Sequence, residues 1–170
     1  MWDWLRRALG LPERAFDVPA GGARVQDGDS LAVGGRRIRL SGIDAPEIGQ
    51  PIRGPGGEDA GRLAASALRE MMRGRALRVR PEGQDAYGRI VASVWAEGVG
   101  DLSMAMLAGG WGVALPSAGR SGRRAQTAAE RSGLGVWGRG GIVEPRIWRA
   151  QMRSAKIVQA SIDRRPVRER

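Results

Sequence analysis

The stretch VQDGDSLAVGGRRIRLSGIDAPE, residues 25–47, decides the fold. Its centre predicts two strands, at residues 30–33 and 36–43, which are joined by Gly34-Gly35. A two-residue loop made of glycines suits the primed turns of β-hairpins, because both residues can adopt positive φ there. We therefore expect an antiparallel hairpin, preceded by a shorter strand over residues 23–26.

Acidic residues flank this hairpin at both ends. Asp27 and Asp29 come before it, and Asp44 and Glu47 follow it. The two ends of a hairpin can meet at one rim of a sheet, where carboxylates repel one another unless a cation lies between them. The spacing therefore predicts a cation site at this rim.

Arginines are placed to form an anion site beside the acids. Arg39 lies on the second strand, and strand alternation turns its side chain away from the apolar face of the hairpin. A later piece, Asp85-Ala86-Tyr87-Gly88-Arg89, brings back an acid and an arginine. Together these residues predict a cation site that faces an arginine-lined anion site.

Hydrophobic periodicity and turn residues place the other elements. A loop rich in Gly and Pro at 48–57 precedes a helix whose apolar stripe runs from Ala60 to Met72 and which Gly74 ends. Further along the chain we expect strands at 76–80 and 90–96 on either side of a turn at 81–86, a short helix capped by Asp101, a helix over 122–131 capped by Ser121, and a last helix opened by Pro145.

The predicted fold class is α+β and mainly β: a five-stranded OB-fold barrel with three helices and a C-terminal helical extension. Five short strands, with one helix between the third and the fourth, favour a small barrel of this type. The predicted boundaries are an N-terminal segment at 1–20, the barrel domain at 21–138, and a basic, partly disordered extension at 139–170.

Composition fits a soluble globular chain and excludes several kinds of site. Of the 170 residues 42 % are hydrophobic, the mean hydropathy is −0.33, and no apolar run reaches the ~18–20 residues that span a bilayer. The lack of cysteine excludes disulfides and thiolate metal sites, and the lack of histidine excludes imidazole ligands and Ser/His/Asp triads. Any metal must therefore be a hard cation bound by oxygen.

The first 20 residues contain a short amphipathic piece with Trp2, Leu5 and Leu9 on one side. They do not resemble a signal peptide, because they have no long apolar core and Asp3 falls too early. We therefore expect a cytoplasmic chain by default, or an exported or anchored one if an N-terminal segment was trimmed.

The net charge is +10, and the excess lies in the C-terminal third. Residues 1–116 contain 15 arginines against 14 acids, whereas residues 117–170 contain 13 basic residues against 4 acids. Such an excess attracts polyanions at long range, but a solvated basic tail explains it equally well. Charge alone leaves both interpretations open.

The order of the motifs is more specific than any one of them. Each motif alone is typical of a turn. In succession, Asp-Gly-Asp-Ser, Arg-Leu-Ser-Gly-Ile-Asp-Ala-Pro-Glu, a helix and Asp-Ala-Tyr-Gly-Arg resemble the staphylococcal nuclease family. The resemblance covers about residues 23–148 and includes Gly-Val-Trp at Trp137 and the segment from Glu144-Pro145 to Trp148-Arg149. It implies an OB barrel with three helices that cleaves phosphodiester bonds of DNA and RNA with one calcium ion.

The resemblance also implies roles for residues at the acidic rim. Asp29 and Asp44 give carboxylate oxygens to calcium, and Ala45 stands where the family has a threonine that binds through its backbone carbonyl. Glu47 matches the general base, or the residue that orients the attacking water. Asp27 matches a structural acid of the turn.

For the substrate side, the resemblance implies that Arg39 and Arg89 hold the phosphate and stabilise its developing charge. Tyr87 occupies the place of a tyrosine beside the nucleotide, and it is the only tyrosine in the chain. Many family members have further tyrosines after the second helix, where this chain has Trp111, which we expect to pack in the core.

Three functions follow from these observations. The first is a calcium-dependent nuclease with low sequence specificity acting on DNA and/or RNA. The second is a non-catalytic nucleic-acid-binding OB-fold module, against which the full set of acids and arginines argues. The third and weakest is a membrane-surface protein that uses the N-terminal segment and the basic tail. The sequence leaves the preferred polymer, the product ends and the oligomeric state open.

Overall fold

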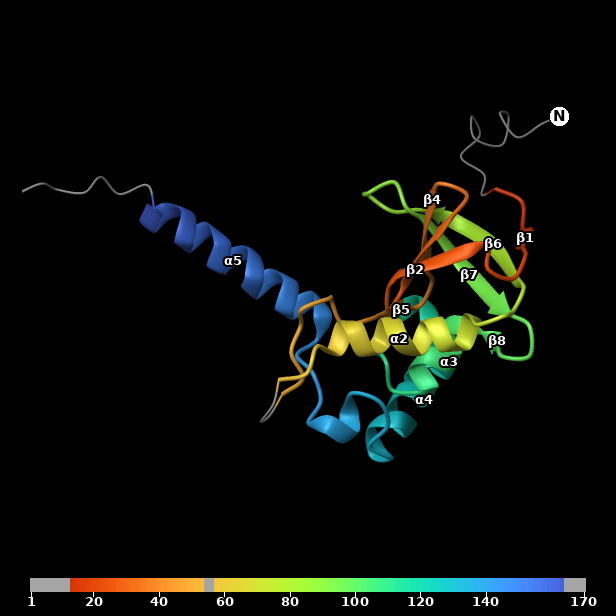
Figure 1. Cartoon of the computed structure of the whole chain (residues 1–170). Helices are drawn as coiled ribbons and strands as arrows, with labels where there is room; N and C mark the ends of the chain where they lie inside the picture. The colour runs from red at the N-terminus through yellow and green to blue at the C-terminus, as the bar shows by residue number, and fades with distance from the viewer. Residues whose placement is uncertain (1–12, 54–56, 164–170) are drawn as a thin grey trace, which may run out of the picture.

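The computed structural model describes residues 13–53 and 57–163 (Figure 1). The strands are β1 (Phe16–Val18), β2 (Ala23–Asp27), β3 (Ser30–Val33), β4 (Arg36–Leu40), β5 (Ile43–Asp44), β6 (Leu77–Gln84), β7 (Ile90–Ala96), β8 (Gly100–Asp101) and β9 (Val113–Ala114). The helices are α2 (Ala60–Met72), α3 (Leu102–Ala108), α4 (Gly119–Arg131) and α5 (Pro145–Asp163), with short 3₁₀ turns η1 (Pro116–Ala118) and η2 (Trp137–Arg139).

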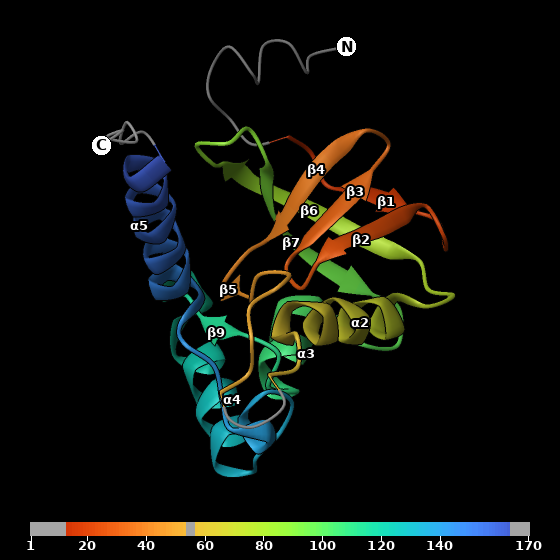
Figure 2. The same cartoon turned by 60° about the vertical axis from the view of Figure 1, so that its left-hand side comes forward.

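The larger sheet has the strand order β1-β6-β7-β4-β3-β2, with β8 added to β7. Its pairs are antiparallel except β4 and β7, and a separate small sheet joins β5 to β9. Figure 2 shows the large sheet curled into a half-barrel, with α2 and α3 across its open end and α4 farther out. The predicted OB-type α+β fold is confirmed in this form.

The hairpin at the centre of the sequence forms as expected. Gly34 and Gly35 have φ of 52° and 78°, and β3 pairs with β4 in the register Leu31 to Ile38. The second strand ends at Leu40 rather than at Ile43, because the chain turns at Gly42 and residues 43–44 pair with β9 instead. Asp44, at the end of β5, therefore belongs to the small sheet.

Two other strand predictions need correction. The turn expected at 81–86 is wrong over 81–84, because β6 continues to Gln84 and accommodates Pro81 next to a bulge between Pro81 and Gly83. Inside the expected N-terminal segment, Phe16–Val18 forms β1 and pairs with β6. The amphipathic piece with Trp2, Leu5 and Leu9 lies outside the described residues.

The helices largely follow the predicted stripes. Ala64 and Leu68 of α2 are fully buried against the half-barrel, and Asp101 caps α3 by accepting a hydrogen bond from the backbone N–H of Met104. The expected cap of α4 at Ser121 is wrong, because η1 leads directly into a helix that begins at Gly119. Within the described ranges, no helix is long and apolar enough to cross a membrane.

Helix α5 begins at Pro145, as expected, and continues to Asp163. Figures 1 and 2 show it projecting from the body as an arm, with its first turns beside the rim that carries β5. The disorder predicted for the end of the chain concerns residues 164–170, which lie outside the described part.

Candidate functional site

The acids at the two ends of the hairpin meet at one guanidinium. Asp29, in the turn before β3, and Asp44, in β5, are both buried. Arg39 of β4 lies between them, with Nη1 3.1 Å from Asp29 Oδ2 and Nη2 2.8 Å from Asp44 Oδ1. The structure therefore brings together the three side chains that sequence spacing placed at one rim.

Burial raises the pKa of Asp29 to about 7, although the neighbouring charge of Arg39 and hydrogen bonds act in the opposite direction. Its carboxylate accepts hydrogen bonds from Ser30 Oγ at 2.9 Å and from the backbone N–H of Ala45 at 3.2 Å. Burial also acts to lower the pKa of Arg39, but the charge of Asp29 together with the hydrogen bond and charge of Asp44 outweighs this and raises it. Arg39 thus only partly offsets the cost of burying the charge of Asp29.

Asp27 and Ala45 hold the turn around Asp29 in place. Asp27 Oδ1 accepts a hydrogen bond from the backbone N–H of Asp29 at 3.1 Å, which closes the turn. A Cβ at Gly28 would lie 2.6 Å from the Cβ of Ala45 and 2.8 Å from that of Ala64. The turn is therefore packed tightly against β5 and α2, and only glycine fits at its centre.

Glu47 stands at the edge of the same rim, with 38 % of its side chain exposed. Its backbone N–H donates to Oε1 of the fully buried Gln50, whose Nε2 donates to the carbonyl of Val143 at 2.6 Å. On the other side, a Cβ at Gly61 would lie 2.1 Å from the Glu47 carbonyl oxygen. The Glu47 peptide is held between these contacts, and sequence reasoning had missed Gln50 because nothing in its neighbourhood marked it as buried.

The loop after β6 aims the second arginine at the site. Asp85 accepts hydrogen bonds from the backbone N–H groups of Tyr87 and Arg89, and from Arg89 Nε at 2.7 Å. Burial acts to raise the pKa of Asp85, but these hydrogen bonds and the charge of Arg89 together outweigh it and hold that pKa below its usual range. Arg89 Nη1 then lies 3.4 Å from Ser30 Oγ. Ser30 therefore links Arg89 to the buried acid pair.

The loop also presents the single tyrosine. Tyr87 is 74 % exposed, and the guanidinium carbon of Arg89 lies 5.7 Å from the centroid of its ring. Arg37 Nη2 donates to its carbonyl oxygen at 2.9 Å. Trp111, by contrast, is half-buried and packs against both apolar clusters of the protein. The structure thus leaves the tyrosine ring, and not Trp111, available at the site.

One arginine at the site comes from α5. Arg149 donates from Nη2 to Asp44 Oδ2 at 2.9 Å and from Nη1 to Glu47 Oε1 at 2.6 Å. Burial would lower the pKa of Arg149, but its hydrogen bonds to Asp44 and Glu47 raise it above the ordinary value. The only sequence signal for this contact was the likeness of the segment from Glu144 to Arg149 to family endings.

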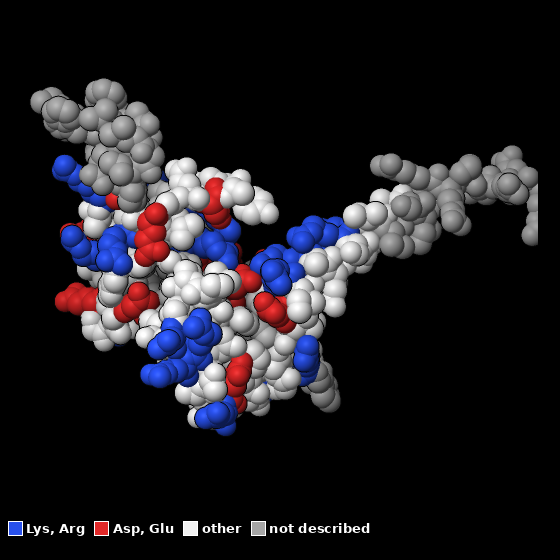
Figure 3. All heavy atoms as spheres, turned by 180° about the vertical axis from the view of Figure 1, so that it is seen from behind, with Lys and Arg blue, Asp and Glu red and all other residues white. Residues whose placement is uncertain are grey.

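These residues line one groove, with a volume of about 640 Å³. The polar part of its wall consists of five arginines, two acids, a tyrosine and two serines: Arg37, Arg39, Arg89, Arg149, Arg153, Glu47, Asp85, Tyr87, Ser41 and Ser117. Figure 3 shows basic side chains both on the body and on the near part of the arm, with a notch between them. A groove of this charge fits an anionic ligand of roughly nucleotide size.

A metal site is not preformed among side chains of the described residues, which contain no group of three or more His, Cys, Asp or Glu placed to hold an ion. The two buried carboxylates at 2.8 and 3.1 Å from a shared guanidinium nevertheless supply oxygen donors that converge on a cation. Their chemistry fits a hard divalent ion whose remaining ligands are a carbonyl, water or substrate.

Comparison with known proteins agrees with this geometry. The family model described as "Staphylococcal nuclease homologue" matches residues 37–139, more than half of the chain. The chain belongs to the staphylococcal nuclease family. The match begins inside β4 and ends after Trp137, so it includes Arg39, Asp44, Glu47 and Arg89 and stops before α5.

Several relatives resemble this family member over part of their length. A "Probable endonuclease LCL3" of Yarrowia lipolytica is 47 % identical over 79 residues, 45 % of this chain and 34 % of the relative. "Succinoglycan biosynthesis protein ExoI" of Rhizobium meliloti is 31 % identical over 121 residues, 69 % and 63 % of the two chains. An "Uncharacterized endonuclease" of Haemophilus influenzae is 28 % identical over 134 residues, 75 % and 71 %. The chain thus spans less than two thirds of the first two.

Proposed function

We propose that this protein is a calcium-dependent nuclease that hydrolyses phosphodiester bonds of DNA and/or RNA with low sequence specificity. The observation that carries the proposal is the linked set of Arg39, Arg89 and Glu47 around the buried Asp29–Asp44 pair. Family membership and relatives named as endonucleases support the same reaction class.

Calcium would be held by carboxylate oxygens of Asp29 and Asp44 and by the backbone carbonyl of Ala45. When bound, it would neutralise charge on the phosphate and make water more acidic. Because burial raises the pKa of Asp29 to about 7, calcium would have to displace a proton from this carboxyl at lower pH, and once bound it would stabilise the ionised form. Ala45 supplies the carbonyl but no hydroxyl, so its side chain adds nothing to such a site.

The arginines bind the phosphate and stabilise the charge that grows on it during attack by water. Guanidinium forks can bond two phosphate oxygens at once and remain protonated throughout. Arg39 is fixed by its two ion pairs, and Arg89 is fixed by Asp85, so both are oriented before substrate arrives. Such preorganised donors typically contribute 100- to 1000-fold in rate, about 3–4 kcal/mol each.

Glu47 is the base in this proposal. It accepts the proton of the attacking water as the new P–O bond forms, and the departing oxygen takes a proton from solvent as its bond to phosphorus breaks. Its carboxylate is hydrogen-bonded to Arg149, so this guanidinium must shift or share its donors for the proton to transfer. The same contact is the observation that favours the alternative, a non-catalytic nucleic-acid-binding module.

Low specificity follows from what the groove offers. Its arginines recognise phosphate, which is common to every nucleotide. The exposed ring of Tyr87 can stack on any base. These groups therefore do not distinguish ribose from deoxyribose.

The test is digestion of single-stranded DNA, duplex DNA and RNA by the wild-type protein and by Glu47→Gln, with calcium or with a chelator. We expect cleavage that requires calcium and falls at least about 100-fold in the variant. Tight binding without cleavage in every condition would support the binding module instead. Cleavage that persists in the chelator, or in Glu47→Gln, would contradict the proposed mechanism.

A further inference from the structure

The charge of α5 is distributed on one side. From Pro145 to Ile162 the helix contains no acidic residue. Arg149, Arg153 and Lys156 follow one another at spacings of four and three, which places them on one face of a helix. We call these three residues the α5 basic stripe. It covers about 10 Å of the helix axis, since each residue advances the helix by 1.5 Å.

The contacts of Arg149 turn this stripe toward the groove. Its two ion pairs, to Asp44 and Glu47, fix which side of the helix faces the body. Arg153, one turn farther out, then lines the groove together with Arg37, Arg39 and Arg89. The stripe is therefore a wall of the groove and its continuation along the arm, opposite the arginines of the half-barrel (Figure 3).

The outer part of the stripe has no acidic partner in the part of the chain that the structure describes. Arg153 and Lys156 form no ion pair with any acid whose side chain the structure describes, and both are exposed. Arg149 and Arg39, in contrast, each pair with two carboxylates. Cations that face a groove without acidic partners are free to bind successive anions of a ligand.

The apolar residues of α5 argue against a lipid surface as that ligand. The exposed ones, Ile147, Met152 and Ile157, are five residues apart, so each is rotated by about 140° from the previous one. They form no continuous apolar face of the kind that inserts into a membrane. The ligand is better described as an extended polyanion with regularly repeated charges.

We propose that the α5 basic stripe binds the phosphates of a polynucleotide strand next to the phosphate held by Arg39 and Arg89. The strand then runs from the groove outward along the arm. This inference rests on the proposed function in taking the groove as the place of cleavage. It predicts that the protein binds a long strand more tightly than the groove alone would allow.

The experiment measures binding of a fluorescein-labelled 20-nucleotide single-stranded DNA, with chelator present, as a function of salt. The variant is Arg153→Gln/Lys156→Gln. The matched control is Arg24→Gln/Arg69→Gln, which removes two exposed arginines that line a different depression, between β2 and α2. For the stripe variant we expect roughly tenfold weaker binding at low salt, with the log–log salt slope smaller by about 1.4 for two lost phosphate contacts. The control should bind like the wild type.

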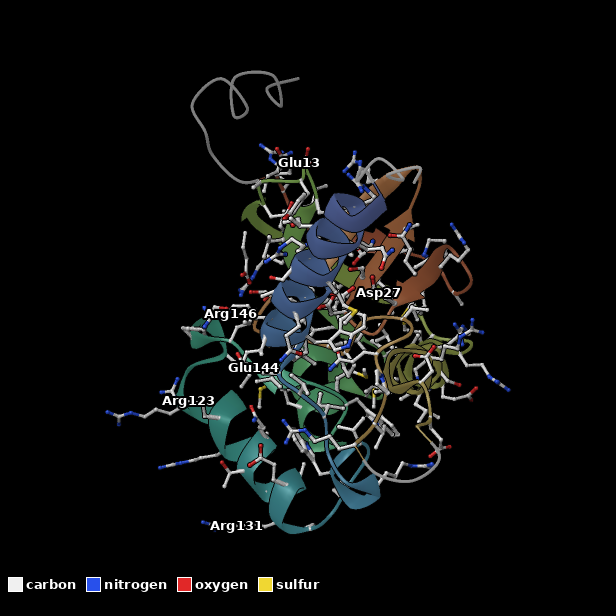
Figure 4. The ribbon with its side chains drawn as sticks, turned by 90° about the vertical axis from the view of Figure 1, so that its left-hand side faces the viewer. Glu13, Asp27, Arg123, Arg131, Glu144 and Arg146 are labelled. Atoms are coloured by element: carbon white, nitrogen blue, oxygen red, sulfur yellow. The ribbon has the colours of Figure 1, made fainter. Side chains whose placement is uncertain are left out.

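A second measurement compares hydrolysis of a long strand with hydrolysis of a substrate that has a single phosphate. Hydrolysis of the 20-nucleotide strand should fall more in the stripe variant than hydrolysis of bis(p-nitrophenyl) phosphate, which offers a single phosphate. Equal losses in the stripe variant and the control would overturn the inference, as would a loss that appears only in Arg123→Gln/Arg124→Gln on the outer face of α4. Figure 4 shows Arg123 pointing away from the groove. If the stripe variant binds the 20-nucleotide strand more weakly but the wild-type protein hydrolyses neither substrate, the inference about the stripe stands and the proposed function is overturned.

Discussion

The rim of the half-barrel and the α5 arm contribute cations to the same acids in different ways. At the rim, Arg39 emerges from a strand paired on both sides and lies between two buried carboxylates. On the arm, Arg149 reaches Asp44 and Glu47 from a helix that otherwise projects from the body (Figure 1). The first arginine is placed by the sheet, whereas the second is placed by the direction in which its helix leaves the body.

This difference separates what is built into the fold from what can move. An arginine bridging two buried acids is part of the stability of the rim, because its removal leaves charges without compensation. An arginine that is one-third exposed can exchange its carboxylates for another anion at small cost. We therefore expect substitutions at the rim to affect folding and activity together, and substitutions on the arm to affect ligands alone.

The largest effect is expected for Arg39→Ala. Activity should fall at least about 100-fold through loss of a phosphate donor, and the free energy of unfolding should fall by about 3–5 kcal/mol because buried Asp29 loses its ion-pair partner and buried Asp44 keeps only Arg149. Arg89→Ala should lose activity to a similar degree with little change in urea unfolding. The control is Arg37→Ala, which lines the same groove but contacts no acid at the rim. Equal unfolding midpoints for Arg39→Ala and Arg89→Ala would contradict the expectation that only Arg39 contributes to the stability of the rim.

The rim should also respond to pH when no metal is present. Asp29 keeps its proton up to about pH 7 in the folded protein but loses it near 3.8 in the unfolded chain. Between these values the folded state binds more protons, so the free energy of unfolding falls as pH rises, by ~1.4 kcal/mol per pH unit at the steepest point.

Urea unfolding between pH 5 and pH 8 in a chelator measures this dependence. The Asp29→Asn variant, which carries no titrating group at this position, should show a flatter profile. An identical profile in the variant would show that the pH dependence arises elsewhere.

A smaller effect is expected for Tyr87→Ala at the exposed loop. Loss of one stacking platform should raise KM for single-stranded DNA about fivefold, the lower end of the 1–3 kcal/mol range for stacked bases. The value kcat should change little, since the ring touches no group of the acid pair. Tyr87→Phe keeps the ring and is the matched control. A fall in kcat with unchanged KM would show instead that the tyrosine orients Arg89.

The smallest effect is expected for the arm. Arg149→Gln removes a cation from Asp44 and Glu47, so calcium should bind about threefold more tightly by calorimetry, in line with a partly exposed ion pair of 0.2–1 kcal/mol. The control is Arg153→Gln, which removes the same charge from the same helix without touching either acid. Unchanged calcium affinity in Arg149→Gln would mean that its contacts do not compete with the ion.

Sequence reasoning predicted the rim because strand alternation and turn chemistry decide it locally. The side of β4 on which Arg39 projects follows from its buried neighbours Ile38 and Leu40, and the glycine loop fixes the hairpin. The position of Arg149 could not be predicted in this way. It depends on the direction in which α5 leaves the body, which is set by distant contacts such as that of Gln50 with Val143.

The same limit explains the errors elsewhere. Proline usually marks the end of a strand, but the bulge that lets β6 pass through Pro81 depends on pairing with β7. Ser121 has a side chain that can cap a helix, but η1 leads into α4 so that the N-cap position falls at Ala118, three residues earlier. In both cases a tertiary or neighbouring contact overrode a local preference.

The close approach of Gly61 to the Glu47 carbonyl has a practical consequence. The helix touches the peptide of Glu47 itself, and Gln50 holds this peptide from the other side, so the backbone at Glu47 has little room to shift. A single methyl group added at position 61 would therefore displace the Glu47 peptide and disturb the groove from the side of the helix, without any change to a side chain that lines it.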